Sequence, residues 1–269
     1  MRLPGSESPR PLPVPLALVV TAAGVGAMFG GGLLAAFLGL RLGPRGQIAF
    51  GTVLLAVPAL LTLVDRPPAR AAALGSAAVT HRTAGLSTLL GAALWVGSIG
   101  LMEMQSLVSP PPAEYLEAFR TLHRALVPDG PLDMVVSLAV IAVLPGLCEE
   151  LVVRGVLLPS LVRPLGLLGA VAGSAFLFAA MHLDPYRFLF TFAVGCVLGV
   201  LRLRTGSLWP PVFAHVTLNA LTFAIAPLID DPAQPYTPQG ALGLACLVAG
   251  AVMTWPLLRA LGRRPAPPA

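Results

Sequence analysis

Charged residues are scarce in this chain, and lysine is missing altogether. Of 269 residues, 11% are charged and all 17 basic residues are arginine, while 56% are hydrophobic. A soluble domain carries about 25% charged residues, so the composition excludes an ordinary soluble domain. With a mean hydropathy of +0.84, the chain is predicted to be a polytopic membrane protein, and one helical bundle can use its whole length. We attach no chemical meaning to the missing lysine.

Cysteine is also rare, and no disulfide framework is expected. Cys148, Cys196 and Cys246 lie in apolar segments, where cysteine behaves as a small buried hydrophobe. The net charge of +5 would suggest nucleic acid as a partner of a soluble protein. Here the arginines lie in short loops, where they set membrane topology. We therefore expect the lipid bilayer as a partner and no nucleic acid.

Eight apolar runs predict eight membrane-spanning helices, since a span needs about 20 residues. The first run, of about 27 residues, is too long for the apolar core of a signal peptide, which has about 7–15 residues. The fold class is therefore all-α, a polytopic transmembrane helical bundle of about eight helices. The predicted spans are 14–40, 48–64, 83–102, 134–162, 165–181, 188–201, 208–229 and 240–258.

The spans form a single transmembrane helical domain, 14–258, between two tails. The first tail, 1–13, is polar and Pro-rich and is predicted to be disordered, and the second, 259–269, is basic and Pro-rich. The longest polar connection, 103–133, has apolar residues at helical spacing, which predicts an amphipathic helix on the membrane surface. Its apolar face holds Tyr115, Leu116, Phe119, Leu122 and Leu126, and its other face holds Glu114, Glu117, Arg120 and Arg124.

The arginines predict the orientation in the membrane. With eight spans both termini lie on one side, and placing them in the cytoplasm puts twelve arginines inside and five outside. The positive-inside rule therefore favours a multi-pass protein of the cell membrane with cytoplasmic N- and C-termini. The five on the outer side are Arg41, Arg45, Arg120, Arg124 and Arg187.

Three polar clusters interrupt the apolar helices, and the outer members of each stand four residues apart. That spacing places them on one helix face about one turn apart. A charged side chain inside the bilayer is costly and is by default a functional hypothesis. The clusters are Glu149 and Glu150 with Arg154, Phe178 with His182, and His215 with Asn219.

The first two clusters are predicted to meet across a helical hairpin. Arg163-Pro164-Leu165-Gly166 is a turn by its Pro and Gly, and it lies midway between Glu149 and His182. Folding there brings the two side chains to the same depth. Glu150 can pair with Arg154, whereas Glu149 is rotated by about 100° and faces elsewhere.

The third cluster, His215 and Asn219, comes from a later span that can pack against this hairpin. Counting residues from the turns places Glu149 toward the outer leaflet but His215 nearer the cytoplasm. A re-entrant segment at 207–211, or a sixth span that fails to cross, would reconcile the two depths. A carboxylate, two imidazoles and an amide would then form a hydrolytic site, with or without a metal.

Each cluster also has a purely structural interpretation. Glu150 and Arg154 alone suggest a buried ion pair, His182 beside Asp184 suggests a loop end with Asp184 at a solvated span end, and the third cluster suggests helix–helix hydrogen bonding. Three clusters of hydrolytic residues on separate helices favour catalysis over packing.

These residues resemble the motifs of the CAAX protease and bacteriocin-processing family of intramembrane endopeptidases. The family pattern is EExxxR, then FxxxH, then HxxxN, each on its own transmembrane helix. All three occur here in order, within a catalytic core of about 134–224. The motifs are specific for the family but say little about the substrate, for which a membrane-bound peptide, a leader sequence and an anti-sigma-type regulator are candidates.

The resemblance implies a role for each residue. Glu149 with His182 would activate the attacking water, and His215 with Asn219 would donate to the oxyanion. Glu150 and Arg154 would support the site, although Glu150 can share the catalytic role, and Phe178 would pack one turn from His182. Zinc is a possible cofactor, with Glu149, His182 and His215 as ligands and one open position. A metal-free glutamate mechanism is equally compatible.

Two other classes of function use the same buried polar residues. A proton-coupled transporter would use them as a relay, but it predicts inverted repeats and the sequence has none. A non-catalytic immunity or scaffold protein would retain the motifs without using them. The prediction is an endopeptidase that hydrolyses a peptide bond in a membrane-associated protein or peptide.

Overall fold

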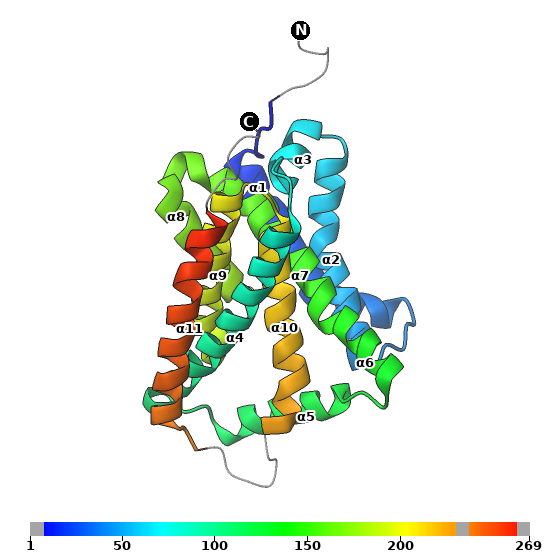
Figure 1. The fold of residues 1–269 in the computed structure, drawn as a ribbon. Coiled ribbons are helices and arrows are strands. Elements are labelled where there is room, and N and C mark those ends of the chain that lie inside the picture. The colour runs from blue at the N-terminus through cyan, green and yellow to red at the C-terminus, as the bar shows by residue number, and fades with distance from the viewer. Residues whose placement is uncertain (1–7, 230–236, 263–269) are drawn as a thin grey trace.

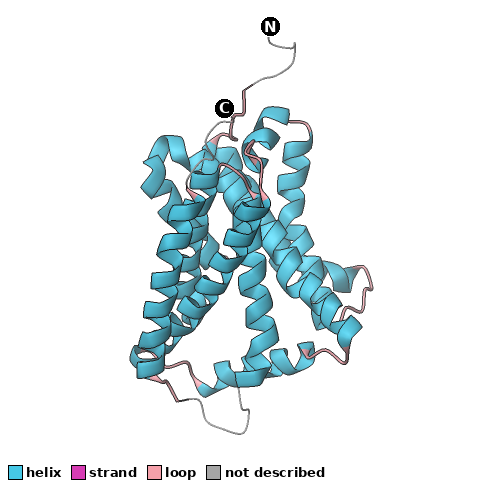
Figure 2. Cartoon of the chain, viewed as in Figure 1, coloured by secondary structure: helices cyan, strands magenta, loops and turns pink. Residues whose placement is uncertain are grey.

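The computed structural model describes residues 8–229 and 237–262, and this part of the chain is helical with a single isolated β-bridge. The predicted all-α fold class is confirmed (Figures 1 and 2). The α-helices are α1 Val14–Phe37, α2 Pro44–Val64, α3 Pro67–Leu74, α4 His81–Val108, α5 Ala113–Leu126, α6 Pro131–Leu138, α7 Leu144–Glu150, α8 Leu158–Ala180, α9 Pro185–Thr205, α10 Trp209–Ile229 and α11 Gly240–Leu261, with π-helical segments η1 Ala139–Val143 and η2 Leu151–Leu157.

The long apolar helices make this a multi-pass membrane protein. Among the described residues, six helical stretches are long and apolar enough to cross a membrane: α1, α2, α4, the stretch Pro131–Ala180, α9 and α11. The stretch Pro131–Ala180 reverses direction at Gly166, whose φ of 67° is left-handed, so it contains the predicted hairpin. With α10 beside it, each of the eight predicted spans has its helix (Figure 1).

One span differs from its predicted bounds. The run 188–201 is the central part of α9, which extends over Pro185–Thr205. Asp184 caps its first turn by accepting the N–H groups of Tyr186 and Arg187, and the left-handed Gly206 ends it. The prediction stopped short because charged residues flank the apolar run, and the full helix is long and apolar enough to cross a membrane.

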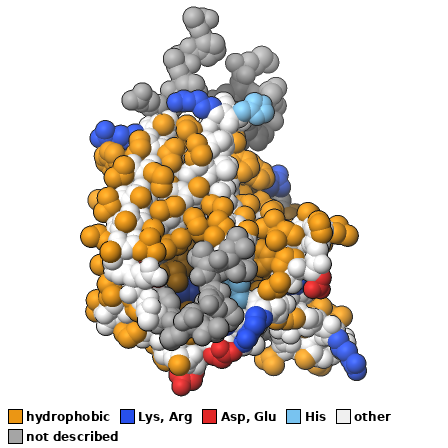
Figure 3. Space-filling model, turned by 60° about the horizontal axis from the view of Figure 1, so that its bottom comes forward, with side chains coloured by type: hydrophobic (Ala, Val, Ile, Leu, Met, Phe, Trp, Pro, Cys, Tyr) orange, Lys and Arg blue, Asp and Glu red, His pale blue; other side chains and the backbone are white. Residues whose placement is uncertain are grey.

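The two ends of the bundle differ in character. In Figure 1, α1 begins and α11 ends at the upper end, and α5 lies across the lower end at a steep angle to the other helices. The predicted amphipathic helix is therefore present as α5, with Leu126 buried and the Arg124–Glu117 ion pair exposed. Figure 3 shows hydrophobic side chains over most of the surface, with charged side chains gathered near the two ends. Cytoplasmic termini remain a prediction.

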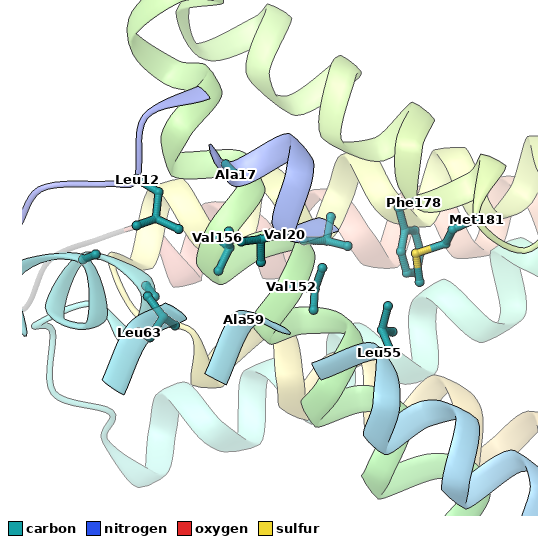
Figure 4. Close-up of a cluster of buried hydrophobic side chains, with 13 residues drawn as sticks. Leu12, Ala17, Val20, Leu55, Ala59, Leu63, Val152, Val156, Phe178 and Met181 are labelled. Carbon is teal, nitrogen blue, oxygen red and sulfur yellow. The ribbon is translucent and has the colours of Figure 1, made fainter. Parts of the chain in front are cut away.

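A buried hydrophobic cluster holds the helix that carries the glutamates. Val152 and Val156 of η2 pack in it with Leu55 of α2 and Phe178 of α8 (Figure 4). In a bilayer such contacts stabilise the bundle through van der Waals packing rather than through transfer from water. This core therefore fixes η2, and with it the first polar cluster, against α1, α2 and α8.

The described ends of the chain lie against the bundle, and the three cysteines lie within it. Leu12 is buried in the same cluster and the N–H of Arg10 donates to the carbonyl of Pro68, so these two residues contact the bundle where disorder was predicted. The apolar side chain of Leu12 explains the difference. At the other end α11 continues to Leu261. Residues 1–7 and 263–269 of the two predicted tails lie outside the described residues. All three cysteines are free, as predicted, and partly buried.

Candidate active site

The two adjacent glutamates lie on α7, between the π-helical segments η1 and η2. π-helical turns are rare and frequently occur at functional sites, and nothing in the spacing of the residues predicted them. Gly146, one turn before the glutamates, lets α7 approach α10 closely. A Cβ atom there would lie 2.6 Å from the side chain of Val216. The glycine therefore permits the contact that brings His215 to the glutamates.

Glu150 is the centre of the hydrogen-bond network. Its side chain is fully buried, and its Oε1 accepts from Arg154 Nη1 at 2.6 Å and from His215 Nδ1 at 2.8 Å. The predicted Glu150–Arg154 pair is thus present, and it is extended by a histidine from another helix. Arg154 is also fully buried, and its Nη2 donates to the carbonyl of Gly195 on α9 at 3.1 Å. Four elements of the fold meet at this ion pair.

Phe178 packs against the buried arginine and both imidazoles of the site. The guanidinium carbon of Arg154 lies 4.4 Å from the centre of its ring, a cation–π contact. The rings of His182 and His215 approach it edge-on, at centroid distances of 5.1 and 5.8 Å. The phenylalanine ring is therefore in contact with the arginine and with both histidines.

The two histidines are held by the same kind of interaction. His182 Nδ1 lies 2.8 Å from the carbonyl of Phe178, and His215 Nδ1 contacts the Glu150 carboxylate. A carbonyl or carboxylate oxygen accepts hydrogen bonds, so each Nδ1 donates and each Nε2 is left for other chemistry. His182 follows the end of α8. Burial lowers the pKa of His182, an effect that the charge of Glu149 opposes.

Glu149 lies close to the ring of His215, and its predicted contact with His182 stays a prediction. Its Oε2 is 3.9 Å from His215 Nε2, and its charge acts on His182. This oxygen is buried without a hydrogen-bond partner among the described residues, whereas buried polar atoms nearly always have one. A carboxylate oxygen left without a donor beside imidazole nitrogens is suited to hold a water molecule.

His215 reaches the glutamates because α10 begins inside the bundle. Ser207 and Leu208 are buried before it starts, and the N–H of Leu208 donates to the carbonyl of Leu74 in α3 at 2.9 Å. The hydrogen bond between His215 and Glu150 shows that the two residues meet, and the re-entrant segment at 207–211 stays a prediction. Asn219 lies one turn beyond His215 with its side chain partly exposed. Its predicted contact with an oxyanion stays a prediction.

The residues suggested as zinc ligands do not form a metal-binding group in this arrangement. Across 8–229 and 237–262, no three or more His, Cys, Asp or Glu side chains are gathered closely enough to hold a metal ion. Oε2 of Glu149 and Nε2 of His215 are 3.9 Å apart, whereas two ligands that a tetrahedral zinc holds at about 2.0–2.2 Å lie roughly 3.4 Å from each other. The donor types suit zinc, with Glu149, His182 and His215 as the residues that would hold it, and zinc as a cofactor stays a prediction.

Several contributors to the site were not found from the sequence. The carbonyl of Gly195 holds Arg154, and Asp184, expected at a solvated span end, binds Tyr115 of α5. A backbone carbonyl leaves no trace in a motif, and a contact between distant residues is set by the fold. The one available signal for the Gly195 contact was the glycine itself, since a small residue on an apolar helix permits close packing of helices. Gly195 lets α9 approach Ala175 of α8.

Comparison with known proteins agrees with the motifs. The chain is 28% identical over 120 residues to "Putative membrane peptidase YdiL" of Bacillus subtilis (strain 168), an alignment that covers 45% of this chain and 46% of that protein. The chain thus matches about half the length of that curated relative. Residues 131–221, which hold all three motifs, match the family described as type II CAAX prenyl endopeptidase Rce1-like, and the resemblance seen in the sequence is confirmed for this part of the chain.

Proposed function

We propose that this protein is an intramembrane endopeptidase that hydrolyses a peptide bond in a membrane-associated protein or peptide. One observation carries the proposal. The buried Oε2 of Glu149 has no hydrogen-bond donor among the described residues and faces the free Nε2 of His215 at 3.9 Å. A carboxylate or imidazole that acts as a general base must lie within hydrogen-bond reach of the proton it takes, directly or through one water molecule. The family match over 131–221 and the peptidase name of the relative support this class of activity.

In the proposed mechanism Glu149, assisted by His182, takes a proton from a water molecule as the water attacks the scissile carbonyl. The new C–O bond forms as the carbonyl becomes an oxyanion, and the proton held by Glu149 then passes to the leaving amine as the C–N bond breaks. His182 keeps its ring orientation through its bond to the Phe178 carbonyl. Such positioned proton transfer contributes typically about 10²–10⁴-fold in rate.

His215 and Asn219 are proposed to stabilise the oxyanion. Since Nδ1 of His215 binds Glu150, its Nε2 donates only when the ring is the imidazolium. Glu150 then orients His215 and Arg154 holds Glu150, which gives the supporting residues a defined task.

The test joins peptide cleavage with metal analysis on purified protein in lipid nanodiscs. Wild-type protein should cleave members of a membrane-peptide library, and Glu149→Gln should abolish cleavage while the protein stays folded, because the amide keeps the shape and removes the base. Glu114→Gln, an exposed change on α5, is the matched control and should retain activity. Near wild-type turnover by Glu149→Gln would overturn the assignment and leave the transporter and scaffold hypotheses standing.

The metal analysis decides whether zinc belongs in the mechanism. Stoichiometric zinc that is lost in His215→Ala would make His215 a ligand and replace the oxyanion role with a metal-dependent one. Activity without bound metal would support the glutamate mechanism as written.

A further inference from the structure

The chain immediately after His182 adopts an unusual backbone conformation. Leu183 has a φ of 50°, which makes it the one non-glycine residue with positive φ in the described part of the chain. Left-handed backbone is uncommon for such a residue, and strained residues of this kind cluster at functional sites. The Leu183 side chain is 72% exposed, so its own packing does not hold it there. Another interaction must fix the turn.

Asp184 supplies that interaction, and it does so from both of its carboxylate oxygens. Oδ1 accepts the N–H groups of Tyr186 and Arg187 at 3.0 and 3.2 Å and so caps α9. Oδ2 accepts the hydroxyl of Tyr115 at 2.8 Å, and the Tyr115 ring packs on the Tyr186 ring at a centroid distance of 4.7 Å. Tyr115 belongs to α5, the helix that lies across the lower end of the bundle (Figure 1).

We propose that Tyr115 is a positioning residue for His182, which it holds through Asp184, so that the surface helix α5 sets the geometry of the catalytic turn. The inference rests on the proposed function. His182 is tied on one side to Phe178 in its own helix. On its other side the chain passes through the strained Leu183 to Asp184, where α5 is attached. Freeing Asp184 from α5 would let Leu183 relax and carry the imidazole away from Glu149.

The contact can be cut without releasing α5. Its C-terminal end is held separately, because Arg45 of α2 donates to the carbonyls of Leu126 and Val127. Its middle is held by the His123 ring, which lies 6.4 Å from Phe223 of α10 between centroids. Removing one hydroxyl at Tyr115 therefore loosens the N-terminal attachment alone.

The experiment compares Tyr115→Phe with Tyr186→Phe, since each removes one hydroxyl from the same ring pair and only the first removes the bond to Asp184. Tyr115→Phe should lower kcat by roughly 10- to 100-fold, the effect of a displacement of about 1 Å, with KM unchanged. Hydrogen exchange of the amides at 182–187 should become faster. Tyr186→Phe should leave both measurements at wild-type values. Adding Leu183→Gly to Tyr115→Phe removes the backbone strain, because glycine adopts positive φ freely. The double variant should therefore regain part of the lost kcat, while the amides at 182–187 stay unprotected.

The outcomes separate this inference from the proposed function. Wild-type kcat in Tyr115→Phe, a change confined to KM, or a loss of kcat with unchanged exchange at 182–187 would each overturn the positioning role. Cleavage that survives Glu149→Gln would overturn the proposed function instead, and the exchange comparison would still show whether Tyr115 holds the turn.

Discussion

The replacement of Arg154 by methionine gives the sharpest test of the buried network. The guanidinium is fully buried, binds Glu150 at 2.6 Å and the Gly195 carbonyl at 3.1 Å, and lies over the Phe178 ring. Methionine keeps much of the length and the apolar contacts of the side chain. The change therefore removes the charge and its hydrogen bonds while leaving a smaller cavity than alanine would.

The expected loss follows from what remains at Glu150. Its carboxylate stays buried with His215 as its hydrogen-bond partner, and breaking a buried pair by removing one partner costs about 3–5 kcal/mol. That corresponds to a fall in melting temperature of roughly 6–20 °C for a domain of this size range. Adding Glu150→Gln to Arg154→Met removes the unpaired charge, so the double variant should recover part of the loss.

The assay is thermal unfolding of purified protein in one detergent, with Glu149→Ala as the comparison. Glu149 carries a buried oxygen with no hydrogen-bond partner in the described structure, so its removal should cost little stability while ending activity. Melting temperatures of Arg154→Met and Glu149→Ala that agree within about 2 °C, the smallest shift expected from 1 kcal/mol, would refute the stabilising role of the pair.

Two further predictions follow from the site and from α5. Asn219→Ala should lower turnover by about 10²–10³, the usual loss for one oxyanion donor, with apparent affinity unchanged in a kcat and KM comparison; a change in affinity alone would contradict the oxyanion role. Burial, then the Asp184 bond, raises the pKa of Tyr115 above its ordinary value of about 10. A raised folded-state pKa gives stability that is fully present below the unfolded value and fades as pH rises toward the folded one. The difference in melting temperature between wild type and Tyr115→Phe should therefore stay constant from about pH 7 to 9 and become smaller above about pH 10. A difference that does not change with pH would count against this account.

Much of the fold was predictable because the membrane restricts what a chain can do. Backbone polar groups in hydrocarbon must be satisfied within the segment, so long apolar runs have to be helices. The hairpin turn was visible for a local reason, since Gly166 supplies the left-handed conformation that the reversal uses. The C-terminal end of α9 was predicted less well, because a charged residue such as Arg202 usually marks the end of a membrane span. Here Arg202 is buried and donates to the carbonyls of Ala72 and Ala73.

The sequence by itself determined the composition of the candidate site, because buried carboxylates, imidazoles and an arginine are too costly in lipid to be incidental. Spacing along single helices also predicted the Glu150–Arg154 pair. Only the tertiary structure decided that His215 binds Glu150, that Glu149 lies beside His215, and that α5 reaches Asp184 through Tyr115. Those contacts depend on how deep α10 begins and on which glycines let helices approach. Depth and approach are properties of packed helices, and a spacing pattern within one helix does not contain them.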